Sequence, residues 1–405
     1  MSAPSPFREK LSYAVGDAAF CLAWNGVSAF LFTSWLGCGI PSAVIGGLLL
    51  GGQVLTAFAD LGVGILSDRW SRNGYRAWVR RSAPAIALLL VALFVVPPAL
   101  MGCARVGAAA ACYVLFLVAY SCGSIPFCSL LKTMTDEAAA RVSFSAWRMT
   151  GAYLGACAVT TLFPLLSAAW SPQVAVGVVA FALYLGLRVS AAGVVERVRP
   201  PEAPIAAPRI GRVFFDRAFL RLFGAAVLFC AANAARFGAL AVYAAEMAAA
   251  PGWCAGGFAC LTLASAAGAA CVSGLSRRRN LRGILALVAV LAAGASGAVF
   301  VGGGAPSGGL LGAFVVVEFL SGMLPTLANV LVVGVADRQE APLAGRLFAV
   351  WGLTGKLGNG LGAGAMALVL SAFPGPLGAR IALSLLPAAF LLALPLLLIG
   401  GRRDA

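Results

Sequence analysis

Histidine is absent from this sequence, and charged residues are scarce. Without histidine, neither a histidine-ligated metal site nor a histidine proton relay can be built. Only 11% of the 405 residues are charged, against about 25% in a typical soluble domain. No GxxxxGK[ST] loop occurs, so the chain has no nucleotide-hydrolysing motif of this type. The opening MSAPSPFREK is polar and lacks the apolar core and cleavage site of a secretory signal.

Most of the chain is apolar, which indicates lipid as its solvent. Hydrophobic residues make up 61% of the sequence, more than a soluble fold could enclose. Inside lipid every backbone N–H and C=O must be paired within the protein, so only helices or a closed barrel remain. The apolar runs reach about 20 residues without the alternation of barrel strands, which favours helices. The sequence therefore predicts an all-α, multi-pass membrane protein.

Twelve segments are long and apolar enough to span a bilayer as helices. Their expected ranges are 11–35, 40–66, 82–102, 106–131, 143–168, 173–194, 218–248, 254–275, 281–303, 308–335, 343–372 and 377–399. Most of the 11 cysteines fall within these runs, where cysteine acts as a small hydrophobic residue rather than as a disulfide partner.

Positive charge is concentrated in alternate loops. The formal charge of +15 comes from 29 Lys and Arg against 14 Asp and Glu. Arginines follow the second and eighth segments and also lie after the last segment, at 402 and 403. The loops near 36–40, 168–172, 249–253 and 303–308 have no Lys or Arg. By the positive-inside rule both termini are expected in the cytoplasm, and the partner of these charges is the bilayer rather than nucleic acid.

A polar, proline-rich stretch, VERVRPPEAPIAAPRIGRVFFDR, interrupts the apolar pattern at 195–217. It predicts a cytoplasmic linker between a six-helix bundle at 1–194 and a second, pseudo-symmetric one at 218–405. This is the architecture of a secondary transporter with the major facilitator fold, in which rocking of the halves gives alternating access to a central solute. We therefore expect a transporter rather than an enzyme, without cofactor or metal site other than a coupling ion.

Charged residues also fall deep inside the expected helices. A charge near the bilayer centre costs about 2.5–3.5 kcal/mol on insertion scales, so such residues usually face a cavity or a partner. Three are acids and three are bases, so full pairing is possible: Asp17, Asp60, Arg148, Arg236, Glu318 and Lys356. Asp17 and Glu318 are expected to neutralise Arg148 and Lys356, and a negatively charged solute would find ligands in Arg148, Arg236 or Lys356. Trp351 offers a flat face for stacking a ring.

Asp60 lies well inside the second segment, with Thr56 one helical turn before it. A carboxylate beside a hydroxyl could bind Na⁺, or could take up a proton when burial favours the neutral acid. The alternative is a structural ion pair with Arg148. A cytoplasmic cluster follows, formed by Asp68, Arg69, Arg72 and Arg76. It predicts either a gate-like latch between the halves or a charge cluster that only sets the topology.

Several stretches have the pattern of one transporter family. They are KLSYAVGD, DLGVGILSDRWSRNGYRAW, YSCGSIPFCSLLKTMTDEAAARVSFSAWRMTGAYLG, and VADRQE followed by GLTGKLGNGLG. These stretches resemble the glycoside–pentoside–hexuronide:cation symporters, typified by the melibiose carrier. The resemblance covers the first half well and the second half only around the tenth and eleventh segments. It implies sugar transport coupled to a cation in a bacterial inner membrane.

The resemblance also implies roles for single residues. Asp60 matches an acid of the family's cation site, and Lys356 matches a lysine near that site. Tyr120 matches a sugar-facing tyrosine, and Arg148 matches the arginine of the fifth helix.

Other positions depart from the family. The second cation-site acid is Thr56 here, and the sugar-binding acid of the first helix aligns with Cys21. The sugar-binding Asp and Trp of the fourth helix become Ser124 and Cys128. The carboxylates that would bind sugar hydroxyls are missing while the basic residues persist. This pattern favours an anionic or amphiphilic solute over a neutral disaccharide, and H⁺ or no coupling over tight Na⁺ binding.

Three functions are compatible with these observations. The leading one is a symporter that imports a small polar, sugar-derivative-like or anionic solute with H⁺ or Na⁺. The first alternative is a proton-driven exporter of an amphiphile, lipid-like molecule or natural product. The second is a membrane assembly or receptor protein that keeps the fold and does not transport. The fold does not require a second copy, so a monomer is expected.

Overall fold

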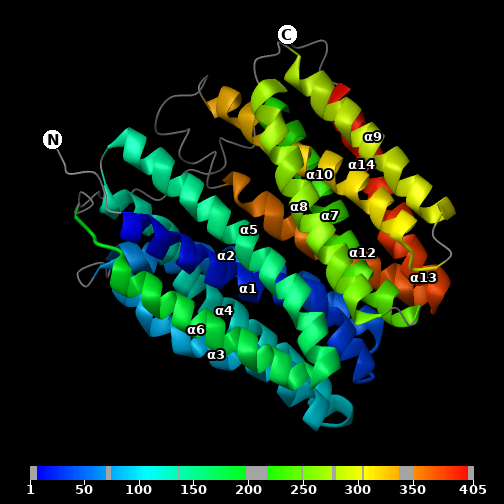
Figure 1. Cartoon of the computed structure of the whole chain (residues 1–405), viewed down its shortest axis with the longest axis horizontal. Coiled ribbons are helices and arrows are strands. Elements are labelled where there is room, and N and C mark those ends of the chain that lie inside the picture. Colours follow the sequence, from blue (N-terminus) through cyan, green and yellow to red (C-terminus); the bar gives the residue numbers. More distant parts are fainter. Residues whose placement is uncertain are drawn as a thin grey trace. The chain divides into compact units, whose positions relative to one another are not determined.

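The computed structural model describes residues 7–69, 74–135, 137–197, 217–247, 250–275, 280–302, 305–336 and 350–399, and it is helical throughout these ranges apart from short connections (Figure 1). Within them, 11 helices are long and apolar enough to cross a membrane. A further helix, α12, has 20 residues. The predicted all-α membrane fold is confirmed.

The chain divides into two compact units, each of which is described by itself. Unit 1 comprises Met1–Ile40 and Leu55–Pro204, and unit 2 comprises Pro41–Val54 and Ile205–Ala405. The second helix contributes to both, because its first half belongs to unit 2. Most of the predicted linker lies outside the described residues, and the division at 195–217 stays a prediction.

Unit 1 is built from the first six helices, except for the part of α2 up to Val54. They are α1 (Phe7–Gly37), α2 (Ser42–Arg69), α3 (Tyr75–Ala99), α4 (Gly102–Met134), α5 (Ala138–Ala169) and α6 (Pro172–Gly193). α1 lies along α5 and α6, and α3 lies along α4 and α6. A Cβ atom at Gly151 or Gly155 of α5 would overlap the backbone of α1 at Ala14 or Ala18. Glycine therefore sets the close approach of α1 and α5, as small residues do between membrane helices.

Unit 2 holds the remaining helices. They are α7 (Arg217–Glu246), α8 (Pro251–Leu275), α9 (Leu281–Gly302), α10 (Gly308–Ala336), α12 (Leu353–Ala372), α13 (Pro376–Arg380), the π-helical turn η3 (Ile381–Leu385) and α14 (Leu386–Ile399). α7 contacts α12, α14 and α10, while α10 also lies against α8 and α9. Buried apolar side chains fill this core, among them Phe219, Leu327 and Leu391.

Several helices extend beyond the apolar windows of the sequence. α3 begins at Tyr75 rather than 82, and α4 continues to Met134 rather than 131. A helix satisfies its own backbone wherever it lies, so it can continue past the apolar stretch that hydropathy detects. The expected span at 343–372 is described from Val350, and α12 begins at Leu353.

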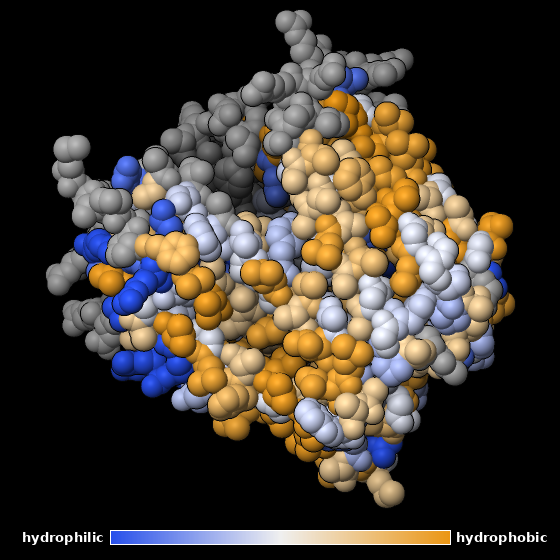
Figure 2. Space-filling view, in the orientation of Figure 1, coloured by the Kyte–Doolittle hydropathy of each residue, from blue (hydrophilic) through white to orange (hydrophobic). Residues whose placement is uncertain are grey.

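Large apolar side chains are exposed along the helices, among them Leu88, Leu154, Leu263 and Leu396. Figure 2 shows apolar residues over much of the visible surface, and hydrophilic residues gathered at the end of unit 1 where α1 and α3 begin. An apolar flank with a polar end is the surface expected of helices that cross a bilayer.

Candidate functional site

The predicted solute ligands of α1 and α4 lie along one face of each helix, because residues three or four apart share a face. On α1 they are Asp17 and Cys21, with Trp24 continuing the same face, and on α4 they are Tyr120, Ser124 and Cys128. The ring centroids of Trp24 and Tyr120 are 5.4 Å apart. The two helix faces therefore meet in unit 1.

Arg148 of α5 joins this group. Its Nε lies 3.4 Å from Oδ2 of Asp17, and its Nη1 donates weakly to Sγ of Cys128 over 3.8 Å. The side chains of Arg148 and Asp17 are 30% and 14% exposed. Asp17, one of the two acids expected to neutralise Arg148 and Lys356, thus forms a partly accessible ion pair with Arg148. Its role as a solute site stays a prediction.

Asp60 of α2 accepts a hydrogen bond from the hydroxyl of Ser121 on α4, with the oxygens 2.5 Å apart. Ser121 and Thr56 are both buried. Ser121 is absent from the predicted site, although it follows Tyr120 in YSCGS, a polar stretch that interrupts an apolar helix. Among the described residues, no three acidic or cysteine side chains could hold a metal ion.

In unit 2, Arg236 of α7 donates from Nε to Oε1 of Glu318 on α10. The other carboxylate oxygen accepts from the hydroxyl of Ser265 on α8 at 2.9 Å. Nη2 of Arg236 donates to Ser321 at 3.0 Å and to Asn233 at 3.4 Å. Glu318, expected to neutralise Arg148 or Lys356, is paired here with Arg236. The two predicted solute ligands, Arg236 and Glu318, are 1% and 0% exposed, so their ion pair is enclosed, unlike that of Asp17 and Arg148.

The other predicted residues of unit 2 lie at α12. Lys356 is partly buried on this helix and belongs to a different unit from Asp60. Nε1 of Trp351 donates to Oδ1 of Asn329 at 2.8 Å, and the centroid of its ring lies 6.5 Å from that of Phe219. Their parts in cation coupling and solute binding stay predictions.

Of the predicted cytoplasmic gate, the structure describes Arg76. Arg72 and the side chains of Asp68 and Arg69 lie outside the described residues. The backbone N–H of Arg76 donates to Glu196 at 2.8 Å, and its Nε donates to the carbonyl of Ala191 at 2.9 Å. Arg76 thereby ties the start of α3 to the end of α6 within unit 1, and its part in a gate stays a prediction.

A second charged contact at this end is absent from the sequence prediction. Both Nη atoms of Arg197 donate to the carboxylate of the buried Glu9, at 2.9 and 2.8 Å. Its backbone N–H donates to the carbonyl of Thr133 at 2.7 Å. The hydrogen bond to Glu9 raises the pKa of Arg197 above its ordinary value. The segment after α6 is therefore fastened to α1 and α4.

Three relatives are similar to part of the chain. The inner membrane symporter YicJ of Escherichia coli (strain K12) is 30% identical over 164 residues, 40% of this chain and 35% of the relative. The isoprimeverose transporter of Lactiplantibacillus pentosus is 31% identical over 172 residues, 40% of this chain and 34% of the relative. A provisionally assigned 2,3-dihydroxypropane-1-sulfonate exporter of Escherichia coli (strain K12) is 28% identical over 163 residues, 39% and 35% of the two chains. The match spans about a third of the length of each relative.

Two solved structures share the fold over almost the full length. The nucleoside transporter NupG has a TM-score of 0.77 at 13% identity, covering 98% of this chain and 99% of that one. A bacterial homologue of the human lysosomal transporter Spinster, inward-facing and unoccupied, has a TM-score of 0.69 at 12% identity, covering 99% and 96%.

A family match covers nearly the whole chain. Residues 12–399 match the family described as MFS/sugar transport protein. The match and the symporter relatives confirm the predicted major facilitator fold and the resemblance to cation symporters. The chain belongs to the MFS/sugar transport protein family, whose relatives here are membrane transporters and not enzymes.

Proposed function

We propose that the protein is a secondary transporter that moves a small, polar, negatively charged organic solute across a bacterial inner membrane together with a proton. One observation carries the proposal: the ion pair of Asp17 and Arg148 is partly accessible and lies on helices that also bear the paired rings of Trp24 and Tyr120. The symporter relatives support transport, and the arginine-rich ends support two cytoplasmic termini.

The solute class follows from the groups on these helix faces. A guanidinium binds a carboxylate or sulfonate through two parallel, charge-assisted hydrogen bonds, and the hydroxyls of a neutral sugar carry no charge to strengthen such a pair. Cys21, Ser124 and Cys128 supply no carboxylate for sugar hydroxyls. The aromatic rings can cover the carbon skeleton of the solute. We infer that the anionic group of the solute replaces Asp17 as the partner of Arg148.

A coupled proton keeps the charge balanced during this exchange. An uncompensated charge in the membrane costs about 2.5–3.5 kcal/mol, so an anion enters at least cost together with a cation. Asp60 is the proposed proton carrier, because it accepts a hydrogen bond from Ser121 and because Thr56 stands where the similar symporters have the second acid of their cation site. A proton needs one such carboxylate, whereas a sodium ion needs several oxygen ligands.

The experiment uses purified protein in two steps. A thermal-shift screen of sugar acids, sulfonates and neutral sugars identifies a solute, and proteoliposomes then measure its uptake under an imposed pH gradient. Asp60→Asn should abolish the response to the gradient while exchange of solute across the membrane continues. Gradient-driven uptake by Asp60→Asn at the wild-type rate would refute the proton role. Absence of any binding or exchange would favour a non-transporting assembly or receptor protein.

Export is the second candidate, favoured by one specific observation. A relative carries the name of an exporter, and its named solute is an anionic sulfonate with two hydroxyl groups. The small, weakly polar side chains of Cys21 and Cys128 could also contact an apolar part of such a solute. Flux measured in inverted and in right-side-out vesicles under the same gradient distinguishes export from import.

A further inference from the structure

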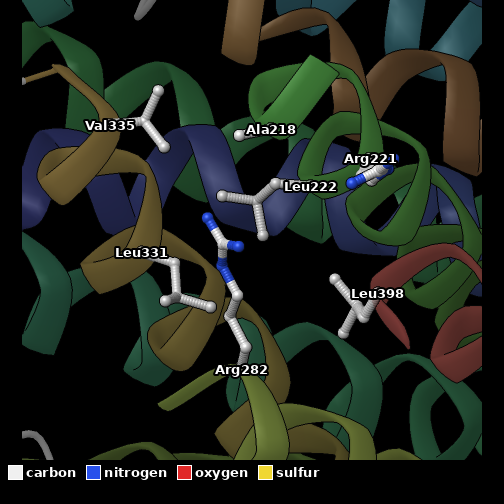
Figure 3. Close-up of a pocket in the computed structure, with 7 residues that line it drawn as sticks. All are labelled: Ala218, Arg221, Leu222, Arg282, Leu331, Val335 and Leu398. Atoms are coloured by element: carbon white, nitrogen blue, oxygen red, sulfur yellow. The ribbon is translucent and has the colours of Figure 1, made fainter. Parts of the chain in front are cut away.

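A pocket lies at the end of unit 2 where α7 and α9 begin and where α10 and α14 end. It is open to the surface and is lined by Ala218, Arg221, Leu222, Arg282, Leu331, Val335 and Leu398 (Figure 3). These helix ends adjoin arginine-rich loops in the sequence, so the positive-inside rule puts the pocket at the cytoplasmic face of the bilayer.

The lining combines two guanidinium groups with an apolar wall. Figure 3 shows Arg282 reaching from α9 toward Leu222 of α7 and Leu331 of α10. Arg221 belongs to the same lining, and none of the seven lining residues is acidic. A free cytoplasmic anion would need only the arginines. The leucines and the valine indicate a ligand that has an apolar part as well.

The surroundings in the sequence add positive charge. Arg277, Arg278 and Arg279 precede Arg282, and Arg402 and Arg403 follow Leu398. These basic neighbours outnumber the acidic Asp216, Asp337 and Glu340 that flank Ala218 and Val335. Each basic residue near an anionic membrane surface contributes about 1 kcal/mol of attraction to acidic lipids. Basic pockets between membrane helices on the cytoplasmic side are typical sites for anionic lipid headgroups.

We propose that this pocket binds an anionic phospholipid. Arg221 and Arg282 hold the phosphate of the headgroup through charge-assisted hydrogen bonds, and the first methylene groups of the acyl chains lie against Leu222, Leu331 and Leu398. Topology alone would require arginines at this end, but it would not require them to line a pocket together with the buried Leu222 and the partly buried Leu331 and Leu398.

The test is lipid retention measured by native mass spectrometry on the full-length protein in detergent. Protein is titrated with phosphatidylglycerol, with phosphatidylcholine, or with inorganic phosphate. We expect phosphatidylglycerol to be retained over phosphatidylcholine, and we expect excess inorganic phosphate not to displace it. Equal retention of the two lipids would overturn the proposal. Displacement by phosphate alone would assign the pocket to free anions instead.

Variants locate the site. Arg282→Gln and Arg221→Gln should each lower retention of phosphatidylglycerol about fivefold, the loss expected for one arginine. Arg188→Gln is the matched control, because Arg188 is an exposed arginine of unit 1 that lies over the ring of Tyr184. If Arg282→Gln does not fold, Arg282→Lys replaces it in the experiment. This variant keeps the positive charge and should therefore retain most of the lipid. If Arg282→Gln and Arg221→Gln retain as much phosphatidylglycerol as Arg188→Gln does, the lipid binds elsewhere and the proposed site is refuted.

Discussion

The guanidinium of Arg236 and the carboxylate of Glu318 form an ion pair inside unit 2, joining α7 to α10 with 1% and 0% of their side chains exposed. Ser265 and Ser321 satisfy further polar atoms of the pair. Removal of one partner would leave the other charge buried without a counter-charge. Such a loss costs about 3–5 kcal/mol, whereas removal of both partners is often close to neutral.

Arg236→Leu and Glu318→Leu should therefore each lower the free energy of unfolding by about 3–5 kcal/mol. The double variant should recover most of this loss. Thermal unfolding of purified protein in detergent measures both effects. If each single variant keeps wild-type stability and the double variant loses solute exchange, the pair binds solute and is not a structural element.

Arg148→Lys should weaken binding of an anionic solute about tenfold, because lysine keeps the charge but loses the planar fork that matches two oxygens. Asp17→Asn should strengthen binding of the same solute, since it removes the carboxylate that occupies Arg148 at 3.4 Å. The dissociation constant from calorimetry with the best anionic ligand of the solute screen checks both. Equal losses for an anionic and a neutral sugar in Arg148→Lys would contradict the anionic solute.

Much of the fold could be predicted from the sequence, because lipid permits few structures. Long apolar runs dictate helices, whereas the orientation across the bilayer that the arginine-rich loops indicate stays a prediction. Helix ends were harder to predict than helices themselves. In α3, for example, the charged residues from Tyr75 to Arg81 extend the helix beyond the apolar stretch that hydropathy detects. The π-helical turn at Ile381–Leu385 has no hydropathy signal at all.

The candidate site was only partly predictable. A charge deep in an apolar run has to find a partner, so the sequence identified Asp17, Arg148, Arg236 and Glu318. It could not say which acid pairs with which base, because pairing depends on how helices distant in sequence pack. Ser121 was missed for the same reason, since a serine in a helix gives no signal of its own until Asp60 is seen beside it.

Gly155→Val should destabilise the protein by about 1–3 kcal/mol more than Gly177→Val, because the added side chain would collide with the backbone of α1 at Ala18. A Cβ added at Gly177 of α6 would meet nothing within 4 Å, so its variant measures the effect of valine in a helix alone. Thermal unfolding of both variants gives the difference. Equal stabilities would mean that α1 and α5 do not approach closely here.

The start of α3 provides a last test, because Glu196 accepts hydrogen bonds from the backbone N–H groups of Tyr75 and Arg76 at 3.2 and 2.8 Å. Gly74 precedes them with φ +75° and ψ 158°, a conformation that costs other residues about 1–3 kcal/mol. A Cβ there would also lie 2.6 Å from the carboxylate of Glu196. Gly74→Ala should therefore destabilise the protein by more than backbone strain alone.

Gly375→Ala is the matched control, since Gly375 has φ 84° and ψ −161° with nothing within 4 Å of a Cβ. We expect Gly74→Ala to lower the unfolding temperature more than Gly375→Ala, and Glu196→Ala to remove that excess in the double variant. Glu196→Ala alone should speed hydrogen exchange at the amides of Tyr75 and Arg76, because a helix N-terminus depends on such acceptors. Additive effects of Gly74→Ala and Glu196→Ala, with unchanged exchange, would show that Glu196 does not hold the end of α3. In that case the segment after α6 would be fastened to unit 1 through Arg197 and Glu9 instead.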